Sequence, residues 1–438
     1  MNEINIKQLS TVLFLSIGLW MFSACDILEV ENPNNLIEDE LSDPASAVAI
    51  VNGSEAAVTR ALGAIYAPYS TASDELTWIG SRDGWERLNL GDVEDRSNEF
   101  TDNAFRYVGE GRWTADEAIK RIEGFREEGT LQNINNLARA YLYGAIMYIT
   151  ITDMFEDYAL SDRQEAAPPV GPSNMPQLYE TAIEYIDSGL TYAEQAGNED
   201  LTSFFQALRA RTNFSIAARS KIKPSVDTDN PLVSSPAADA DAEAALQQMN
   251  GSDTWHRMIQ NSDTPGIPVG DMSLALQVNV RLEMRISDEY IVAEDSRPAG
   301  IVLEDPIDEI PDPILTQLVN EFTEQERYAD INIVSAREMH LILAESALAN
   351  NDMVGFTEHI NAIREFDGLT EYTGQMDARE LLEHTRRVNL FLQGRRVLDH
   401  YRFDNPSAYW STSSAAFTSP GALFPITITE VRANPHID

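Results

Sequence analysis

Apolar residues recur at helical spacing along most of the chain. In residues 135–149, Leu137, Tyr141, Ala145 and Ile149 are four positions apart and therefore line one face of a helix. Comparable stripes predict further helices with the same apolar spacing. These helices cover residues 44–66, 175–197, 201–222, 238–249, 335–352 and 353–366.

The predicted helices follow one another in pairs, which indicates helical hairpins. Pro44 after Asp43 suits the start of the first helix, and Gly197 suits the end of a later one. Hairpins that cannot bury their apolar faces alone stack on one another, as tetratricopeptide-like repeats do. Residues 266–313 are rich in proline and aspartate, and they contain short β-like pieces such as residues 274–284. We therefore predict a mainly α fold, a superhelix of stacked hairpins with an irregular insertion.

Charge narrows the range of partners. The chain has 71 acidic and 31 basic residues and a formal net charge of -40 at pH 7. Nucleic-acid binding needs clustered lysine and arginine, so a nucleic-acid partner is excluded. The simplest interpretation is an acidic, well-solvated surface.

The N-terminal segment contains the only cysteine. Residues 11–22 carry no charge, and this run is too short to cross a bilayer but has the length of the apolar part of a signal peptide. Two small residues then precede Cys25, an order that resembles the lipobox of bacterial lipoproteins. We expect residues 1–24 to be a signal peptide and Cys25 to be the lipid attachment site. An ordinary secretory signal is the alternative.

The rest of the chain is expected to be a tethered soluble body. Two acyl chains give stable anchoring where one gives only marginal binding. No other run approaches 18 apolar residues. We predict an acidic tether over residues 25–42 and a single helical domain over residues 43–438.

Four segments, spread from Cys25 to the last residues, resemble the SusD/RagB family of outer-membrane nutrient-binding lipoproteins. They are an acidic start with an Asn-Pro pair, an acidic helix followed by an Asn-x-x-Arg helix, an arginine-rich Gly-Arg motif, and a closing Pro-Ile…Asn-Pro pattern. Together they span nearly the whole chain. The segments are residues 25–34, 337–369, 386–402 and 423–437.

The resemblance implies a function. Family members have four tetratricopeptide-like units and an irregular, loop-rich ligand face, and they cover a SusC-type TonB-dependent transporter in the outer membrane. They capture glycans or, in some members, peptides, and they have no catalytic activity. Asp26, Glu29 and Glu31 resemble the family's signal for display on the cell exterior, with a flexible acidic tether as the alternative. No cofactor or metal is expected.

The Gly-Arg motif is expected to be structural. Gly394 would permit close helix packing, and Arg396 and Asp399, three positions apart, would pair on one helix face. The positions that depart from the family pattern are Gln393, Val397 and His400.

Candidate ligand residues come from aromatic rings in polar loops. Sugars stack their C–H faces on such rings and bond their hydroxyls to polar neighbours. Residues 73–92 fit best, and a second aromatic pair follows the Gly-Arg motif; packing of the tryptophans onto the helices is the alternative. The candidates are Trp78, Arg82, Trp85, Asn89, Tyr409 and Trp410.

Motifs of common enzyme classes are missing from the sequence. It contains no zinc-protease, nucleophile-elbow, phosphate-loop or dinucleotide fingerprint. The sequence thus favours a binding protein for an oligosaccharide or peptide. Two alternatives stay open: a secreted helical polysaccharide hydrolase, and a tetratricopeptide-type scaffold with protein partners only.

Overall fold

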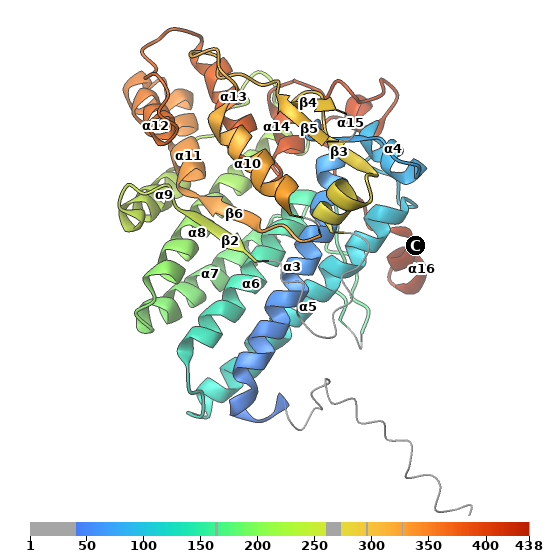
Figure 1. The fold of residues 1–438 in the computed structure, drawn as a ribbon. Coiled ribbons are helices and arrows are strands. Elements are labelled where there is room, and N and C mark those ends of the chain that lie inside the picture. Colours follow the sequence, from blue (N-terminus) through green and yellow to red (C-terminus); the bar gives the residue numbers. More distant parts are fainter. Residues whose placement is uncertain (1–40, 163–164, 260–272, 295–296, 326, 438) are drawn as a thin grey trace, which may run out of the picture. The chain divides into compact units, whose positions relative to one another are not determined.

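Long helices lying side by side form the frame of the protein (Figure 1). The computed structural model describes residues 41–162, 165–259, 273–294, 297–325 and 327–437. Pro44–Asp438 form one compact unit.

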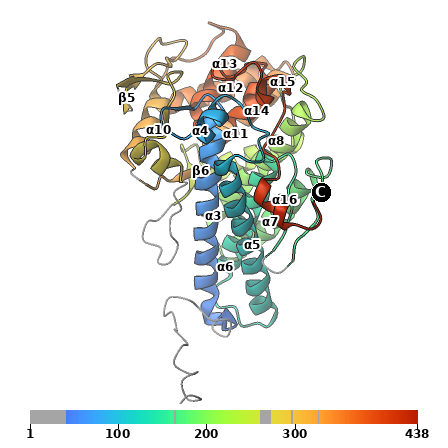
Figure 2. The same cartoon turned by 90° about the vertical axis from the view of Figure 1, so that its right-hand side faces the viewer.

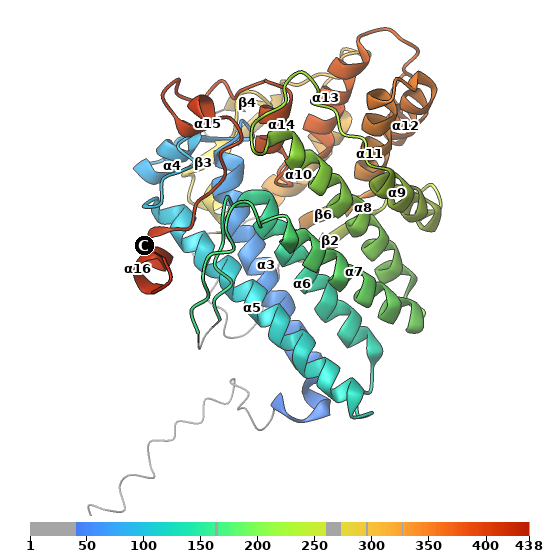
Figure 3. The ribbon, with the colours of Figure 1, turned by 180° about the vertical axis from the view of Figure 1, so that it is seen from behind.

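The first half of the chain supplies six long helices. Helix α3 packs on α5, α6 on α7, and α8 on α9, while α7 also contacts α8 (Figures 1 and 3). The α6–α7 and α8–α9 pairs are stacked hairpins of the kind that the apolar spacing predicts. The helices are α3 (Ala47–Thr71), α5 (Glu99–Glu127), α6 (Ile134–Met154), α7 (Gln177–Gln195), α8 (Glu199–Ile222) and α9 (Pro236–Met249).

The second half adds another hairpin and shorter helices. Helices α11 and α12 pack on each other, and α9 and α13 contact α11. Their apolar faces form a second core around Leu341, Phe356, Ile360 and Leu381. The helices are α10 (Pro313–Glu324), α11 (Ala336–Ala349), α12 (Met353–Phe366), α13 (Ala378–Asn389) and α14 (Arg396–Arg402).

Short elements gather at one end of the long helices, where Figure 2 shows α4 and α10 to α15 above α3 and α5. Three two-stranded antiparallel ribbons lie among the helices, pairing β1 with β3, β2 with β6, and β4 with β5. The strands are β1 (Leu76–Trp78), β2 (Trp255–Met258), β3 (Met284–Ile286), β4 (Ile291–Glu294), β5 (Arg297–Ile301) and β6 (Ile331–Ser335). The remaining elements are η1 (Pro44–Ser46), α4 (Asp83–Asn89), η2 (Leu276–Val280), α15 (Ala415–Thr418) and α16 (Ile428–Ala433).

Local sequence explains where many helices begin and end. Side chains of Asn, Ser or Asp accept hydrogen bonds from the first backbone N–H groups of most long helices, as good N-caps do. Gly197 follows α7 with φ +66°, a left-handed conformation that suits glycine after a helix end. The capping residues are Asn98, Asn133, Asn198, Ser235, Asp312, Ser335, Asp352 and Asp377.

The mainly helical prediction is confirmed, with two local differences. The prediction of a β-like piece over residues 274–284 is wrong: η2 occupies most of it, and β3 begins only at Met284. Short apolar runs do not distinguish helix from strand by periodicity alone. Helix α5 is missing from the predicted helices because charged residues interrupt its apolar stripe, although its Phe105, Val108 and Ile122 are buried.

The predicted lipid attachment site and export signal are not described by the structure. Cys25, Asp26, Glu29 and Glu31 lie outside the described residues. Within the described ranges, no helix combines the length and apolar character needed to cross a membrane.

Candidate functional site

A cavity of about 170 Å³ lies beside α3, near the end of α10 and the start of β6. Its walls come from segments far apart in sequence, so it exists only in the folded chain. Most of the wall is apolar, and exposed polar residues form the rim. The apolar lining is Leu274, Ala275, Leu318, Phe322, Ala329, Ile331, Phe391 and Leu392, and the exposed polar lining is Glu324, Gln325 and Asp330.

Three polar side chains interrupt this apolar wall. Among the residues that the structure describes, the hydroxyl of Tyr66, the Nε–H of Arg257 and Oδ1 of Asn332 are buried and have no hydrogen-bond partner. The Tyr66 side chain is 1% exposed. Buried polar atoms normally have partners, and an unmade hydrogen bond costs about 1–3 kcal/mol. All three residues line the cavity, so a polar guest that reached these groups would meet hydrogen-bonding atoms without protein partners.

The β2–β6 ribbon positions two of these groups. Arg257 and Asn332 are cross-strand partners, so their side chains leave the same face of the ribbon. Arg257 Nη2 also donates to Glu321 Oε2 at 3.1 Å, and the two charges offset each other. The polar side of the cavity is therefore close to neutral.

The turn after α13 closes the cavity on another side. Leu392 has φ +56° and Gly394 has φ +73°. A Cβ at Gly394 would lie 2.6 Å from Met154 Cε, so the position requires glycine both for its conformation and for close approach. The backbone N–H of Leu392 donates to Glu75 Oε1 at 2.6 Å, and burial raises the pKa of Glu75 to about 7.

The site residues Arg257 and Asn332 are not among the sequence candidates. No linear motif contains them, and they meet only because β2 pairs with β6. Tyr66 is a weaker ligand candidate from the sequence, as an aromatic residue near the end of the first predicted helix; it lies on the buried face of α3 and lines the cavity. A buried tyrosine whose hydroxyl has no partner is visible only in the structure.

The candidate residues 73–92 form a packed corner rather than an open site. Trp85 is fully buried and stacks on Phe100 with ring centroids 3.8 Å apart. Asn89 is buried, and its Oδ1 accepts hydrogen bonds from the Trp78 backbone N–H at 3.0 Å and from Thr77 Oγ1 at 3.1 Å. Packing therefore occupies the Trp85 ring and hydrogen bonding the Asn89 amide, and contact of either with a ligand stays a prediction.

The other candidates lie near this corner and outside the cavity lining. Arg82 is exposed, and Trp78 and Tyr409 are half-buried. Trp410 is buried and donates its Nε1–H to the carbonyl of Ala72 at 2.8 Å, and its contact with a ligand stays a prediction.

The Gly-Arg motif is structural, but its pairing differs from the prediction. Arg396 bonds both carboxylate oxygens of Asp74, at 2.7 Å each, rather than Asp399. Asp399 instead bonds Arg386, at 2.9 and 3.0 Å, and Arg402 at 2.8 Å. The difference arises because α14 lies between two separate sets of charged side chains. Arg396 faces Asp74, whereas Asp399 faces Arg386 and Arg402.

These pairings set the charge of buried groups. Burial alone would raise the pKa of Asp74, but Arg396 and His400 outweigh it and hold that pKa well below its usual value. Burial likewise opposes the ionised form of Asp399, and Arg386 and Arg402 lower its pKa to about 2. Both carboxylates are therefore charged at neutral pH.

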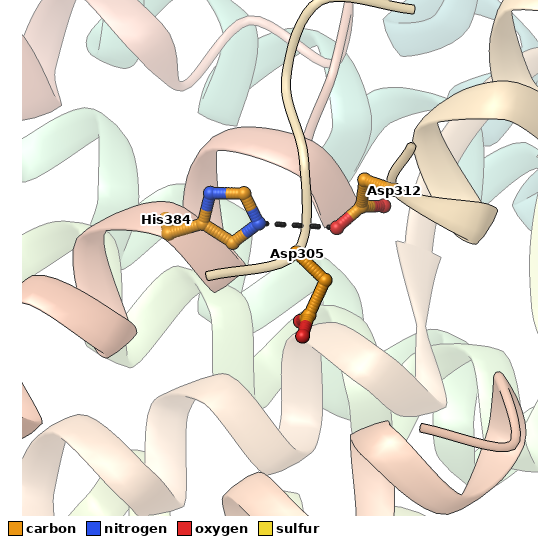
Figure 4. A group of neighbouring side chains, drawn as sticks. All are labelled: Asp305, Asp312 and His384. Atoms are coloured by element: carbon orange, nitrogen blue, oxygen red, sulfur yellow. Dashed lines mark hydrogen bonds and ion pairs between the residues drawn. The ribbon is translucent and has the colours of Figure 1, made fainter. Parts of the chain in front are cut away.

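Asp305, Asp312 and His384 form the one group of three or more potential metal ligands found in the described part of the chain (Figure 4). Arg364 bonds both oxygens of Asp305, at 2.7 and 3.0 Å. Asp312 caps α10 and lies 3.1 Å from His384 Nε2. A cation here would face the Arg364 guanidinium, so the group is better explained as an ion pair and a helix cap.

A second cleft of about 360 Å³ lies between α5, the segment after α6, and α16. It includes Trp113, but several of its polar groups bond one another. Thr429 Oγ1 donates to Asp102 at 2.6 Å, and Ser161 Oγ donates to Glu430 at 3.0 Å. These bonds hold the C-terminal helix on α5, so the cavity beside α3 is the stronger candidate for ligand binding.

Comparisons with known proteins fit this architecture. The model of the SusD family matches residues 322–422, from α10 to the segment after α15. No curated protein sequence is significantly similar to the chain. Solved structures similar to the chain include SusD superfamily proteins from Bacteroides species.

Three of these structures cover nearly the whole chain. A SusD superfamily protein from Bacteroides thetaiotaomicron superposes with a TM-score of 0.62 at 14% identity, over 90% of this chain and 99% of its own. A SusD homolog from the same species gives 0.59 at 14% identity, over 92% and 98%. A candidate sugar-binding protein from Bacteroides vulgatus gives 0.59 at 12% identity, over 90% and 98%.

Sequence and fold thus agree on the region that contains the Gly-Arg motif. The family model covers this C-terminal segment, and the shared fold extends to the helices before it. Residues 322–422 thus match the SusD family, and the chain as a whole has the fold of SusD superfamily structures.

Proposed function

We propose that this protein is a non-catalytic lipoprotein of the outer membrane that captures a nutrient oligomer for a SusC-type TonB-dependent transporter. The match to the SusD family supports nutrient binding, and one structural neighbour is a candidate sugar-binding protein. The family resemblance supplies the transporter as partner and Cys25 as the anchor at the cell exterior. Residues 1–24 are then a signal peptide and residues 25–42 the tether. An oligosaccharide is the favoured ligand, and a peptide is the alternative.

The observation that carries the proposal is the composition of the cavity wall. A sugar ring has apolar C–H faces and hydroxyls that both donate and accept hydrogen bonds. The cavity presents apolar side chains together with the unpaired groups of Tyr66, Arg257 and Asn332. An engineered cavity of roughly 150 Å³ holds one benzene molecule, so 170 Å³ suits a single six-membered ring. We infer that one sugar unit enters while the rest of the oligomer lies across the rim.

Charge favours a neutral sugar. Glu321 offsets Arg257 inside, and Glu324 and Asp330 stand on the rim. The net charge of -40 adds a repulsive field against polyanions. An anionic glycan would therefore meet unfavourable charge at the entrance.

Binding of fluorescently labelled neutral oligosaccharides tests the proposal, with Tyr66→Phe as the variant. This change removes only the hydroxyl, so affinity should fall roughly 2- to 12-fold, the equivalent of a hydrogen bond worth about 0.5–1.5 kcal/mol. Tyr107→Phe is the matched control, because it removes the hydroxyl of a half-buried tyrosine outside the cavity lining. Equal affinity in all three proteins would show that the ligand binds elsewhere.

Two further measurements separate the alternatives. Chromatography of the recovered oligosaccharide should show an unchanged chain length, whereas a hydrolase would shorten it. Pull-down from native outer membranes with a C-terminal tag should recover a large TonB-dependent barrel together with Cys25-acylated protein. Recovery of an unlipidated protein without that barrel would contradict the anchor and the transporter.

A further inference from the structure

The α11–α12 hairpin brings two histidines into direct contact. His340 of α11 and His359 of α12 have their Nδ1 atoms 3.2 Å apart. Their rings are 5.5 Å apart at the centroids, with planes inclined by 40°. Both side chains are half-buried, so solvent and ions can reach them. No residue of this pair takes part in the cavity beside α3 or in the Gly-Arg motif.

The separation of the two nitrogens suits chelation. Imidazole nitrogens bind Zn²⁺ at about 2.0–2.1 Å, so two of them at a tetrahedral angle lie about 3.3–3.4 Å apart. The observed 3.2 Å differs from this by only about 0.1–0.2 Å. The hairpin is fixed by the second core, in which Phe356, Ile360 and Ile363 of α12 are buried. The two ligand positions are therefore held by packed helices rather than by loops.

The protonation state of the pair favours a metal ion. Burial lowers the pKa of His340 to about 4 and also lowers that of His359. Metal ligation requires neutral imidazole, so neither ring has to lose a charge-carrying proton at neutral pH. Carboxylates surround the pair and make its field attractive to a cation. Those that act on the two rings are Asp239, Glu243, Asp352 and Glu358, together with Asp253, whose charge is offset by its ion pair with Arg337.

We propose that His340 and His359 bind a divalent transition-metal ion of the zinc class through their Nδ1 atoms, with water completing the coordination. In the metal-free pair one Nδ1–H donates to the other Nδ1. On binding, that proton moves to Nε2 of the same ring, so both Nδ1 lone pairs face the ion and no net proton is released. The ion would link α11 to α12 across their turn.

This site differs in charge from the group of Asp305, Asp312 and His384. There a guanidinium fills the position beside the carboxylates, at 2.7 Å from Asp305. Among the described residues, no cationic side chain forms a hydrogen bond or an ion pair with either histidine, and the ring of Phe366 lies 6.1 Å from that of His340. The proposal is independent of oligosaccharide binding.

Calorimetric titration of the purified full chain with ZnCl₂ tests the site. A Cys25→Ser background removes the sole thiol as a competing ligand. We expect one ion per chain. His340→Gln and His359→Gln should each weaken binding by at least about tenfold, since losing even a group that only supports a metal ligand costs roughly 10- to 100-fold. His436→Gln, which removes an exposed histidine near the C-terminus, is the control and should leave affinity unchanged.

Two results would overturn the proposal. One is a lack of saturable one-to-one zinc binding, and the other is equal zinc affinity in the two histidine variants and the control. If circular dichroism shows that a variant fails to fold, the test is the visible absorption spectrum of Co²⁺ added to the protein with both histidines intact. Visible absorption bands of a nitrogen-ligated ion with a one-to-one end point are expected, and their absence refutes the site.

Discussion

Replacing Asp74 with Asn should be among the most destabilising single changes in the protein. Asp74 is 3% exposed and accepts hydrogen bonds at 2.7 Å from both Nε and Nη2 of Arg396, which is 8% exposed. Arg387 donates to the same carboxylate at 3.0 Å, and Tyr290 at 3.1 Å. The amide keeps the shape but removes the charge, which leaves Arg396 buried beside no full counter-charge.

The structure sets the size of the effect. Removing one partner of a buried ion pair costs about 3–5 kcal/mol, because the other charge is left desolvated. That is a large part of the roughly 5–15 kcal/mol by which native proteins are stable. Glu289→Gln is the matched control: Glu289 contacts the same Arg387 at 3.4 Å, but its side chain is 42% exposed. Such an exposed pair is worth about 0–1 kcal/mol.

Urea unfolding followed by circular dichroism and tryptophan fluorescence measures both variants. We expect a loss of about 3–5 kcal/mol for Asp74→Asn and less than about 1 kcal/mol for Glu289→Gln. The double variant with Arg396→Met should recover part of the loss, because it also removes the unpaired charge. Equal small losses in both single variants would refute the reasoning that burial, and not the number of ion pairs, determines the cost.

Three further predictions concern buried groups near the cavity. The folded-state pKa of Glu75, about 7, lies above its unfolded value, so the stability that its protonated form contributes is complete at acid pH and is lost as pH rises toward 7 and beyond. The stability of Glu75→Gln relative to wild type should therefore rise by up to roughly 3 kcal/mol between about pH 4 and pH 8. The same stability difference at both pH values would contradict this. Trp85→Ala should cost about 3–5 kcal/mol in urea unfolding, as large core truncations do, whereas Arg82→Ala, three residues earlier and exposed, should stay within about 0.5 kcal/mol. Gly394→Ala should destabilise the protein by about 1–3 kcal/mol, because φ is +73° and the added Cβ would lie 2.6 Å from Met154 Cε; thermal unfolding unchanged from wild type would show that the turn relaxes.

Helices are predicted correctly from the sequence where the apolar spacing is regular, and the predictions fail where the apolar run is short or interrupted. Residues 353–366 have a clean stripe and form α12 over the same span. Residues 274–284 alternate over too short a distance, and they form η2 instead of a strand. Burial of individual side chains is harder to predict, because Trp78 and Trp85 lie in the same polar loop sequence. Only tertiary packing decides that Trp85 stacks on Phe100 while Trp78 stays half-buried.

The candidate site could not be predicted from the sequence for a different reason. Arg257 and Asn332 are 75 positions apart and meet through one strand pair, and Tyr66 approaches them from a helix near the start of the chain. Residue type gives no sign of such a meeting, since each side chain alone is ordinary. Functional residues of this kind follow from topology, and topology follows from the summed packing of all the helices.

The segment that matches the family model also builds much of the cavity. Residues 322–422 contain the wall residues Phe322, Ile331, Phe391 and Leu392 as well as Asn332. The Gly-Arg motif in the same segment is bonded to the end of α3 and the residues after it, through the ion pair to Asp74 and the hydrogen bond from Leu392 to Glu75.

A motif that looks purely structural therefore fixes the frame around the candidate ligand site. Of the other wall groups, Arg257, Leu274 and Ala275 come from the irregular stretch between α9 and α10, outside the matched segment. We infer that the frame is the part this chain shares with the SusD family and that this stretch sets which ligand fits. Exchanging Leu274 or Arg257 should then change ligand preference with little effect on stability, whereas changes at Gly394 or Asp74 should lower stability first and binding only as a consequence.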